Sequence, residues 1–306
     1  MQIGITGATG LIGELLTRRL SEAGHDLVLF SRSLERGQSF SPDSKIVQWD
    51  ALASPLPEGS LDGLDALVHL LGEGIANGRW TAARKKLIRD SRVKGTRSLV
   101  EELHRCQNGP RVLVSASAIG LYGNRGEESL DETSQTGKGF LPSVCKSWEQ
   151  EASLAAEANV RTVLLRTGIV LSTRGGALAK MLLPFRLCFG GPLGPGNQWM
   201  SWIHLEDQIG LILHALERDE VEGPLNATAP NPVKNRAFSK ALGRALGRPA
   251  ITPTPGFVLK LMLGEMAQAL LLEGQKVLPS RAIATGYRFR FPEIHLALQD
   301  LLKRQF

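Results

Sequence analysis

The sequence predicts an α/β fold: a doubly wound parallel sheet followed by a smaller, mainly helical C-terminal region. Two observations predict it. As far as about residue 170, short apolar runs alternate with longer amphipathic segments, which is typical of βα units and a parallel sheet. From Asn231 to Phe306 the pattern is mostly helical, with no further alternation.

The chain opens with the clearest unit. A β-type run, Gln2–Thr6, leads into the turn Gly7-Ala8-Thr9-Gly10-Leu11-Ile12-Gly13, and an amphipathic helix follows as far as Gly24. The apolar run Leu27–Phe30 comes next. A strand, a glycine-rich turn, a helix and a second strand in this order predict a Rossmann-type dinucleotide-binding domain.

The three glycines of the turn have different predicted roles. Gly7 allows the tight turn, Gly10 lets the backbone approach a pyrophosphate, and Gly13 lets helix and strand pack closely. The helix begins where the phosphates would lie, so its unpaired N–H groups face the anion. The predicted cofactor-binding residues of this turn are Gly7, Thr9, Gly10, Leu11, Ile12 and Gly13.

The end of the second strand predicts which dinucleotide is bound. NAD enzymes place an acid there for the ribose 2′-hydroxyl, whereas NADP enzymes offer a cation. The chain has Ser31-Arg32-Ser33, and its nearest acid, Glu35, lies beyond the strand. We therefore expect NADP(H), with Ser31 and Arg32 at the 2′-phosphate.

The βα alternation continues after this unit. Further strands are expected at Ile46–Trp49, Ala66–Gly72, Arg111–Ser115 and Arg161–Leu165, and helices at Thr81–Leu103 and Pro142–Ala158. The carboxyl end of the run Ala66–Gly72 falls beside the glycine-rich turn, where open α/β sheets bind ligands.

After about residue 172 the alternation loosens. Met181–Ile203 mixes glycine, proline and tryptophan, which is typical of a lid or a pocket wall, although core packing of the tryptophans explains it equally well. We expect a dinucleotide-binding domain over residues 1–230, with a substrate-side insert within about 172–205. A C-terminal, mainly helical extension is expected over residues 231–306.

Composition narrows the classes of function. The net charge is +6 and the pI is about 9.4, but the basic residues are scattered or lie on one helical stretch, and no nucleic-acid-binding motif is present. Cys106, Cys145 and Cys188 have no metal-ligand spacing, so no metal site is expected. No apolar run is long enough to span a membrane, and the first strand starts at once, so a cytoplasmic location is expected.

Together these motifs resemble the extended short-chain dehydrogenases/reductases. The matching motifs are Thr6–Gly13, Val68–Gly72, Ser115–Ser117, Leu121–Gly123, Trp202–Asp207 and Gly223–Asn226. Within that superfamily the chain most resembles NAD-dependent epimerase/dehydratase-like proteins with a C-terminal extension, a group without an assigned reaction. Further motifs of that group are Arg79–Thr81, Ser91-Arg92, Lys146–Glu149, Gly190–Gly194 and Leu272–Gln275.

The chain departs from the superfamily at its catalytic pair. That pair is a Tyr acid/base four residues before a Lys that holds the nicotinamide ribose. Here Pro142 stands four residues before Lys146, and neither of the two tyrosines, Tyr122 and Tyr287, precedes a Lys by four. The usual proton-transfer pair is therefore absent.

Other side chains are candidates for catalysis. The resemblance places Ser117 where the family has a catalytic Ser or Thr, and its hydroxyl is predicted to donate a hydrogen bond to a substrate oxygen. Tyr122 is the nearest phenol and the second candidate, although its family counterpart is as often structural. Cys145 is interpreted as a small buried apolar residue, and His204 as a structural histidine.

The resemblance also implies cofactor contacts from the fourth strand and the helix after it. Leu70, Leu71 and Gly72 end that strand beside the crevice, and the resemblance places Arg92 on the helix that runs past the crevice, where a cation can reach an NADP phosphate. A solvated surface arginine explains Arg92 equally well.

Two functions of different classes stay open. The first is an NADP(H)-dependent oxidoreductase or nucleotide-sugar epimerase with a small-molecule substrate, in which the cofactor carries the hydride chemistry. The second is a non-catalytic NADPH-binding sensor or structural protein, which the missing Tyr-Lys pair favours. These residues also leave open whether the chain forms a homodimer; no nucleic-acid or membrane partner is expected.

Overall fold

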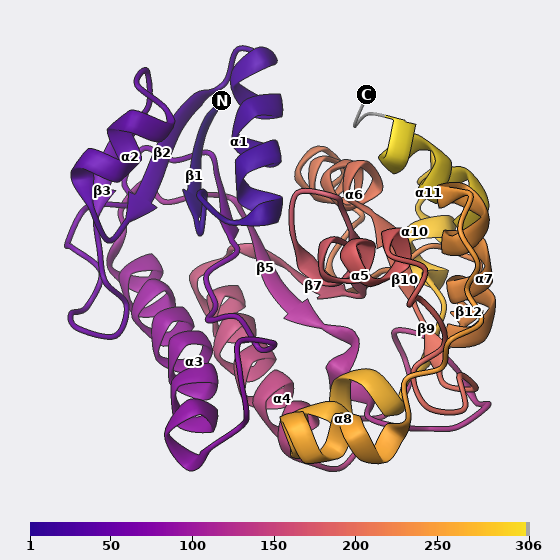
Figure 1. The fold of residues 1–306 in the computed structure, drawn as a ribbon. Coiled ribbons are helices and arrows are strands. Elements are labelled where there is room, and N and C mark those ends of the chain that lie inside the picture. Colours follow the sequence, from indigo (N-terminus) through magenta and orange to yellow (C-terminus); the bar gives the residue numbers. More distant parts are fainter. Residues whose placement is uncertain (304–306) are drawn as a thin grey trace.

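The computed structural model describes residues 1–303, apart from the side chain of Arg36. One central sheet contains seven parallel strands in the order β3-β2-β1-β4-β5-β7-β11 (Figure 1). Their bounds are β1 Gln2–Thr6, β2 Asp26–Ser31, β3 Lys45–Gln48, β4 Ala66–His69, β5 Val112–Ala118, β7 Arg161–Thr167 and β11 Gly223–Ala227. The strand order reverses between β1 and β4, and ligands bind at such a point in open α/β sheets.

Helices cover both faces of this sheet. The helices α1 (Leu11–Glu22) and α6 (Leu205–Glu217) lie on one face, and α3 (Ala82–Arg105) and α4 (Phe140–Ser153) on the other (Figure 1). Alternate residues of a strand feed the two cores: Val68 joins the core under α1 and α6, whereas Leu67 joins the one under α3. The predicted doubly wound, Rossmann-type fold is confirmed.

A third apolar core holds the C-terminal region together, and it draws on residues 171–202 as well as 229–302. The small strand β8 pairs with β10, and β9 pairs with β12. The bounds of these elements are β8 Ile169–Leu171, α5 Gly176–Arg186, β9 Trp199–Met200, β10 Trp202–His204, β12 Val233–Lys234, α7 Asn235–Leu246 and α11 Ile294–Lys303.

Short elements connect α7 to α11. Their bounds are α8 Gly256–Leu263, α9 Glu265–Ala267, the π-helix η3 Gln268–Leu272, β13 Lys276–Val277 and α10 Ser280–Ala284. The strand β13 pairs with β6 (Ser129–Leu130). In Figure 1, α8 lies beside the beginning of α4, although more than a hundred residues separate the two in sequence. The expected, mainly helical C-terminal region is confirmed.

Several element ends differ from the sequence-based expectations. The strand β4 ends at His69, three residues early, and the backbone of Leu70 and Leu71 then passes close to Gly7. The strand β5 continues to Ala118, since its pairing with β7 continues to that residue. The predicted helix from Pro142 starts two residues earlier and ends as the 3₁₀ turn η2, Leu154–Ala158.

Several elements of the structure were not predicted. The strand β11 begins with Gly223-Pro224, which is typical of a turn, and becomes a strand because β7 pairs with it. The helices α5 and α6, the short helix α2 (Leu34–Phe40) and the short strands outside the central sheet were not predicted either. No helix within residues 1–303 is both long and apolar enough to cross a lipid bilayer.

Candidate functional site

The glycine-rich turn between β1 and α1 has the geometry of a phosphate-binding turn. Gly7 has a positive φ of 71°, and a Cβ on it would lie 2.8 Å from the carbonyl oxygen of Leu70. A Cβ on Gly13 would lie 2.3 Å from the carbonyl oxygen of Gly7. Neither position accepts a side chain without moving backbone. These two glycines therefore set the shape of the turn.

Gly10 is different, because a Cβ there would approach a single backbone atom and less closely. A Cβ built there would meet only the Gly7 carbonyl oxygen, at 3.3 Å, and the residue is exposed. Gly10 also caps α1 without any side-chain hydrogen bond, so the first N–H groups of the helix, from Leu11 on, lack helical partners. These donors and the positive end of the helix dipole suit an anion.

The end of β2 presents a cation. The Ser31 hydroxyl donates to the carbonyl oxygen of Ser33 at 2.9 Å and accepts from the Ser33 N–H at 3.3 Å. Gln48 donates to the Arg32 carbonyl oxygen at 3.3 Å, so the backbone of Arg32 is held while its side chain is exposed. Among the described residues, no carboxylate forms an ion pair with this guanidinium. A guanidinium so placed suits a phosphomonoester.

Arg92 is a packed side chain beside the end of β4. Its Nη1 donates to the carbonyl oxygens of Glu73 and Ile88, both at 3.0 Å, and its Cζ lies 5.1 Å from the centre of the Trp148 ring. A Cβ on Gly72 would lie 3.1 Å from that Cζ. Burial lowers the pKa of Arg92, although a guanidinium stays protonated in proteins. The structure thus places Arg92 beside Gly72; its expected contact with an NADP phosphate stays a prediction.

His69, the last residue of β4, holds the end of this strand in place through side-chain hydrogen bonds. It is fully buried between the hydroxyls of Thr6, 2.8 Å from its Nδ1, and Thr96, 3.0 Å from its Nε2. Burial lowers the pKa of His69 from 6.5 to about 4, so the ring is neutral near pH 7. Thr6 also accepts from the N–H of Leu70 at 3.1 Å. The ring therefore ties β1, β4 and α3 together beneath the turn.

The two candidate catalytic hydroxyls belong to one buried polar network. Ser117 donates to Glu149 at 2.6 Å, and Glu149 accepts twice from Arg166, at 2.9 Å each. The Tyr122 hydroxyl accepts from Arg166 at 2.9 Å and donates to Asn226 at 2.7 Å. Burial raises the pKa of Tyr122, and its side chain has no exposed surface. The structure brings Ser117 and Tyr122 together through Arg166, not through direct contact.

Sequence reasoning assigned no role to Glu149, Arg166 or Asn226. The sequence pattern indicated burial for two of them: Glu149 occupies a position on the apolar face of the predicted helix, and Arg166 directly follows an apolar strand run. Charged residues are almost never fully buried unless they are paired. The identity of the partner, however, requires the strand order.

The helix α4 carries the residues that replace the usual catalytic pair. Pro142 and Cys145 are buried, whereas Lys146 is exposed. Lys146 lines a concavity of about 490 Å³ together with Gln150 and Ser153, on a different side of α4 from Cys145 and the Trp148 ring. Burial raises the pKa of the Cys145 thiol to about 12, so the thiol is neutral near pH 7.

His204 and Asp207 fasten the C-terminal chain to α6. The His204 Nδ1 accepts from the N–H of Glu206 at 3.0 Å and caps the helix; its ring stacks on Phe291, with 3.9 Å between ring centres. Its Nε2 lies 3.3 Å from an oxygen of Asp300. The Asp207 carboxylate accepts from the N–H of Phe291 at 2.9 Å, and also from the Arg290 N–H and the Tyr287 hydroxyl. The contacts of both side chains are structural.

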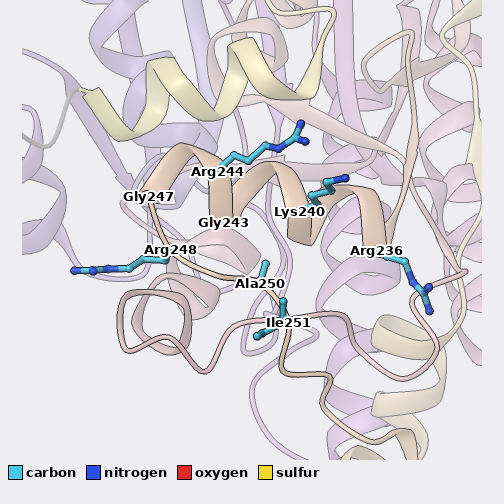
Figure 2. A pocket seen from close by; sticks show the side chains of 8 residues that line it. All are labelled: Arg236, Lys240, Gly243, Arg244, Gly247, Arg248, Ala250 and Ile251. Carbon is cyan, nitrogen blue, oxygen red and sulfur yellow. The ribbon is translucent and has the colours of Figure 1, made fainter.

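A further concavity of about 460 Å³ lies on α7, away from the strand ends. Its cations are Arg236, Lys240 and Arg244 on α7 and Arg248 in the segment after it, and Figure 2 shows them pointing in different directions. Its lining residues include no carboxylate and no histidine. This surface lacks the convergent polar groups of a catalytic site.

Two segments of the chain match known protein families. Residues 3–227 match the NAD dependent epimerase/dehydratase family, and residues 254–301 match a domain of unknown function, DUF1731. The chain is 39% identical over 305 residues to an Arabidopsis thaliana protein described as an epimerase family protein SDR39U1 homolog, chloroplastic, covering 99% of this chain and 87% of that one.

Two solved structures are also similar. The human epimerase family protein SDR39U1, determined with NADPH, superimposes with a TM-score of 0.89 at 37% identity and covers 99% of both chains. A protein described as a nucleoside-diphosphate sugar epimerase from Corynebacterium glutamicum gives 0.80 at 33% identity, covering 98% of this chain and 58% of that one. With its phosphate-binding turn and these matches, the chain belongs to the NAD dependent epimerase/dehydratase family.

Proposed function

We propose that the chain binds NADP(H) at the carboxyl edge of β1, β2 and β4. One observation carries this proposal: the open N-terminus of α1 at Gly10 and the exposed guanidinium of Arg32 lie at the ends of adjacent strands. The first suits the pyrophosphate and the second the 2′-phosphate. The NADPH present in the structure of the human relative supports the same choice.

The proposed cofactor contacts are those expected from the sequence. The turn would hold the pyrophosphate through the residues Gly7, Thr9, Gly10, Leu11, Ile12 and Gly13. Ser31 and Arg32 would hold the 2′-phosphate. Leu70, Leu71 and Gly72 would line the edge of β4, where Arg92 still has Nε and Nη2 to offer to a phosphate oxygen.

For the reaction, we propose an NADP(H)-dependent oxidoreductase or epimerase with a small-molecule substrate. The cofactor would exchange the hydride at C4 of its nicotinamide. The chain would orient the substrate at the end of β5, where the Ser117 oxygen can accept a hydrogen bond from a substrate hydroxyl, because its own proton is donated to Glu149 and not to a substrate oxygen as the sequence led us to expect. Tyr122 would hold Arg166 in place, since it reaches no solvent-accessible space.

A second candidate, an NADPH-binding sensor without turnover, has one specific observation in its favour. Pro142 replaces the usual Tyr, Lys146 lies at the surface, and both candidate hydroxyls are held within the buried network. Loss of a general acid/base typically costs 10²–10⁴-fold in rate. Slow turnover, or none, follows from this arrangement.

The basic helix α3 favours a small-molecule partner over a nucleic acid. Most of its cations already form ion pairs with carboxylates: Arg84 with Glu73, Lys85 with Glu265, Lys86 and Lys94 with Asp90, and Arg97 with Glu151. The carboxylate beside each of these cations weakens its attraction to the phosphate backbone of a nucleic acid.

The experiment is to purify the full chain and identify any carried cofactor by mass and by its absorbance. NADPH and NADH are then titrated by calorimetry, followed by a screen of carbonyl and nucleotide-sugar substrates. Tight NADPH binding with turnover supports the enzyme, and tight binding without turnover supports the sensor. Equal affinity for NADPH and NADH would refute the cofactor proposal.

A further inference from the structure

Apolar side chains from three distant segments meet where α3 and α4 begin. The buried residues Trp80 and Met266 lie at the centre of this group, and the Trp80 indole donates to the carbonyl oxygen of Ile75 at 2.8 Å. Six side chains packed around them remain partly exposed, and we call these the edge cluster: Ile75, Phe140, Leu141, Leu263, Ala269 and Leu270.

The edge cluster lies next to the end of β5. A Cβ on Gly120 would lie 3.4 Å from the Cβ of Leu141, and Gly120 follows Ser117 by three residues. Phe140, the neighbour of Leu141, packs edge-on against Trp80, with 5.1 Å between the ring centres. A molecule that reacts at Ser117 would therefore have apolar side chains beside it.

The segment that covers this edge from the C-terminal side is itself apolar. Residues 256–272 contain only two charged side chains, Lys260 and Glu265. The segment ends in the π-helix Gln268–Leu272, which has no fully buried residue. Such helices are rare and occur frequently at functional sites. The apolar side chains that this turn leaves partly exposed include Leu270 of the edge cluster.

Three cations around the edge cluster already form ion pairs or hydrogen bonds within the protein. Lys85 forms an ion pair with Glu265 and lies 5.1 Å from the centre of the Phe140 ring. Arg84 forms an ion pair with Glu73 at 2.9 Å, and Lys180 donates to the carbonyl oxygen of Ala76 at 3.1 Å. Among the described cations of these segments, Arg79, next to Gly264, and the exposed Lys260 on α8 have no ion pair. A diphosphate needs several convergent donors.

We propose that this site takes an uncharged molecule with an alkyl or aryl body, not a nucleoside-diphosphate sugar. The edge cluster holds the apolar body, and the reactive group lies at the end of β5. This inference rests on the proposed function, because it names the substrate class of the same site. The apolar wall supplies affinity in proportion to the carbon surface that it removes from water.

The experiment measures binding, so it needs no turnover. The full chain, saturated with NADPH, is titrated calorimetrically with 1-butanol, 1-hexanol, 1-octanol and UDP-glucose. We expect the affinity for the alcohols to rise about three- to fourfold for each added methylene, and no heat of binding from UDP-glucose at millimolar concentration. Binding of UDP-glucose that is tighter than that of 1-octanol would overturn the proposal, as would alcohol affinities independent of chain length.

Two matched variants locate the site. Leu270→Asp places a charge in the edge cluster and should weaken 1-octanol at least tenfold, with NADPH affinity unchanged. Leu261→Asp makes the same change on α8 at a side chain that is 76% exposed, and should leave both affinities unchanged. Leu141→Asn is a second test, should Leu270→Asp fail to fold. Unchanged 1-octanol affinity in a folded edge-cluster variant would contradict the proposal.

The two proposals fail separately. Loss of NADPH binding would count against the proposed function alone, since the alcohol titrations can be repeated on the chain without cofactor. Binding of UDP-glucose to a chain that also binds NADPH would leave the cofactor proposal intact and overturn the substrate class.

Discussion

Arg166 and Glu149 form a two-point ion pair under the carboxyl end of β5, with both N–O distances at 2.9 Å. The pair is buried, with 8% of the arginine side chain and 11% of the glutamate side chain exposed. Burial opposes the charge of Arg166, but Glu149 outweighs it and raises the pKa of Arg166. Both proposed functional hydroxyls depend on this pair for their position.

We predict that Arg166→Met lowers the free energy of unfolding by about 3–5 kcal/mol, because it leaves the Glu149 carboxylate buried without its cation. Urea denaturation followed by circular dichroism measures the change. The matched control is Arg174→Met, which removes an exposed pair with Glu14 and should cost less than about 1 kcal/mol. If both variants lose the same free energy of unfolding, the buried pair contributes no more to stability than the exposed one.

The neutral His69 predicts a loss of stability in acid. Its pKa is about 4 in the folded chain and 6.5 as the ordinary value, so between these values the unfolded chain binds a proton that the folded chain does not. The stability contribution is complete above about pH 7 and falls as the pH drops towards 4, by about 3 kcal/mol in all.

His69→Gln tests this prediction, because it keeps hydrogen-bonding groups at the site and removes the titration. The free energy of unfolding is measured by urea denaturation at about pH 7.5 and about pH 4.5. The difference between the two values should be smaller in the variant than in the wild type. If both proteins lose the same stability, His69 does not carry the effect.

Arg32→Ala should weaken NADPH binding by about 10- to 100-fold, since it removes one charge-assisted contact. NADH, which lacks the 2′-phosphate, should bind almost as before. Calorimetric titration with both cofactors gives the ratio. Arg18→Ala, a substitution of an exposed arginine on α1, is the control and should change neither affinity. A parallel loss for both cofactors would assign Arg32 a role other than binding the 2′-phosphate.

Gly10→Ala should mainly weaken NADPH binding, whereas Gly13→Ala should mainly lower the stability of the fold. Gly10 has φ −82° and ψ 171°, which alanine adopts, and its Cβ would lie 3.3 Å from the Gly7 carbonyl oxygen, so we expect a smaller loss of thermal stability than in Gly13→Ala and NADPH binding at least tenfold weaker. The methyl group would occupy the space of the phosphate. In Gly13→Ala the Cβ would collide with the Gly7 carbonyl, and overpacking of this kind costs about 1–3 kcal/mol. Normal NADPH affinity in folded Gly10→Ala would place the phosphate elsewhere.

Local patterns were sufficient for the parts of the fold that depend on neighbouring residues. Thr81 before a long helical pattern predicted where α3 begins, and the Thr81 hydroxyl accepts from the N–H of Arg84 at 3.1 Å. The glycine spacing of the first turn similarly predicted the geometry at Gly7 and Gly13. In contrast, no local pattern predicted a strand at Gly223–Ala227, and only its pairing with β7 shows it as β11.

The sequence by itself determined the Rossmann-type unit and the choice of candidate cofactor residues, because a strand, a turn and a helix are encoded by residues a few positions apart. Only the tertiary structure decided what Ser117, Tyr122 and Arg92 contact. Tyr122 and its partner Asn226 are 104 residues apart, and they meet because β5, β7 and β11 are neighbours in the sheet. Buried polar groups take the partners that strand order brings within reach, and that order depends on the packing of the whole chain.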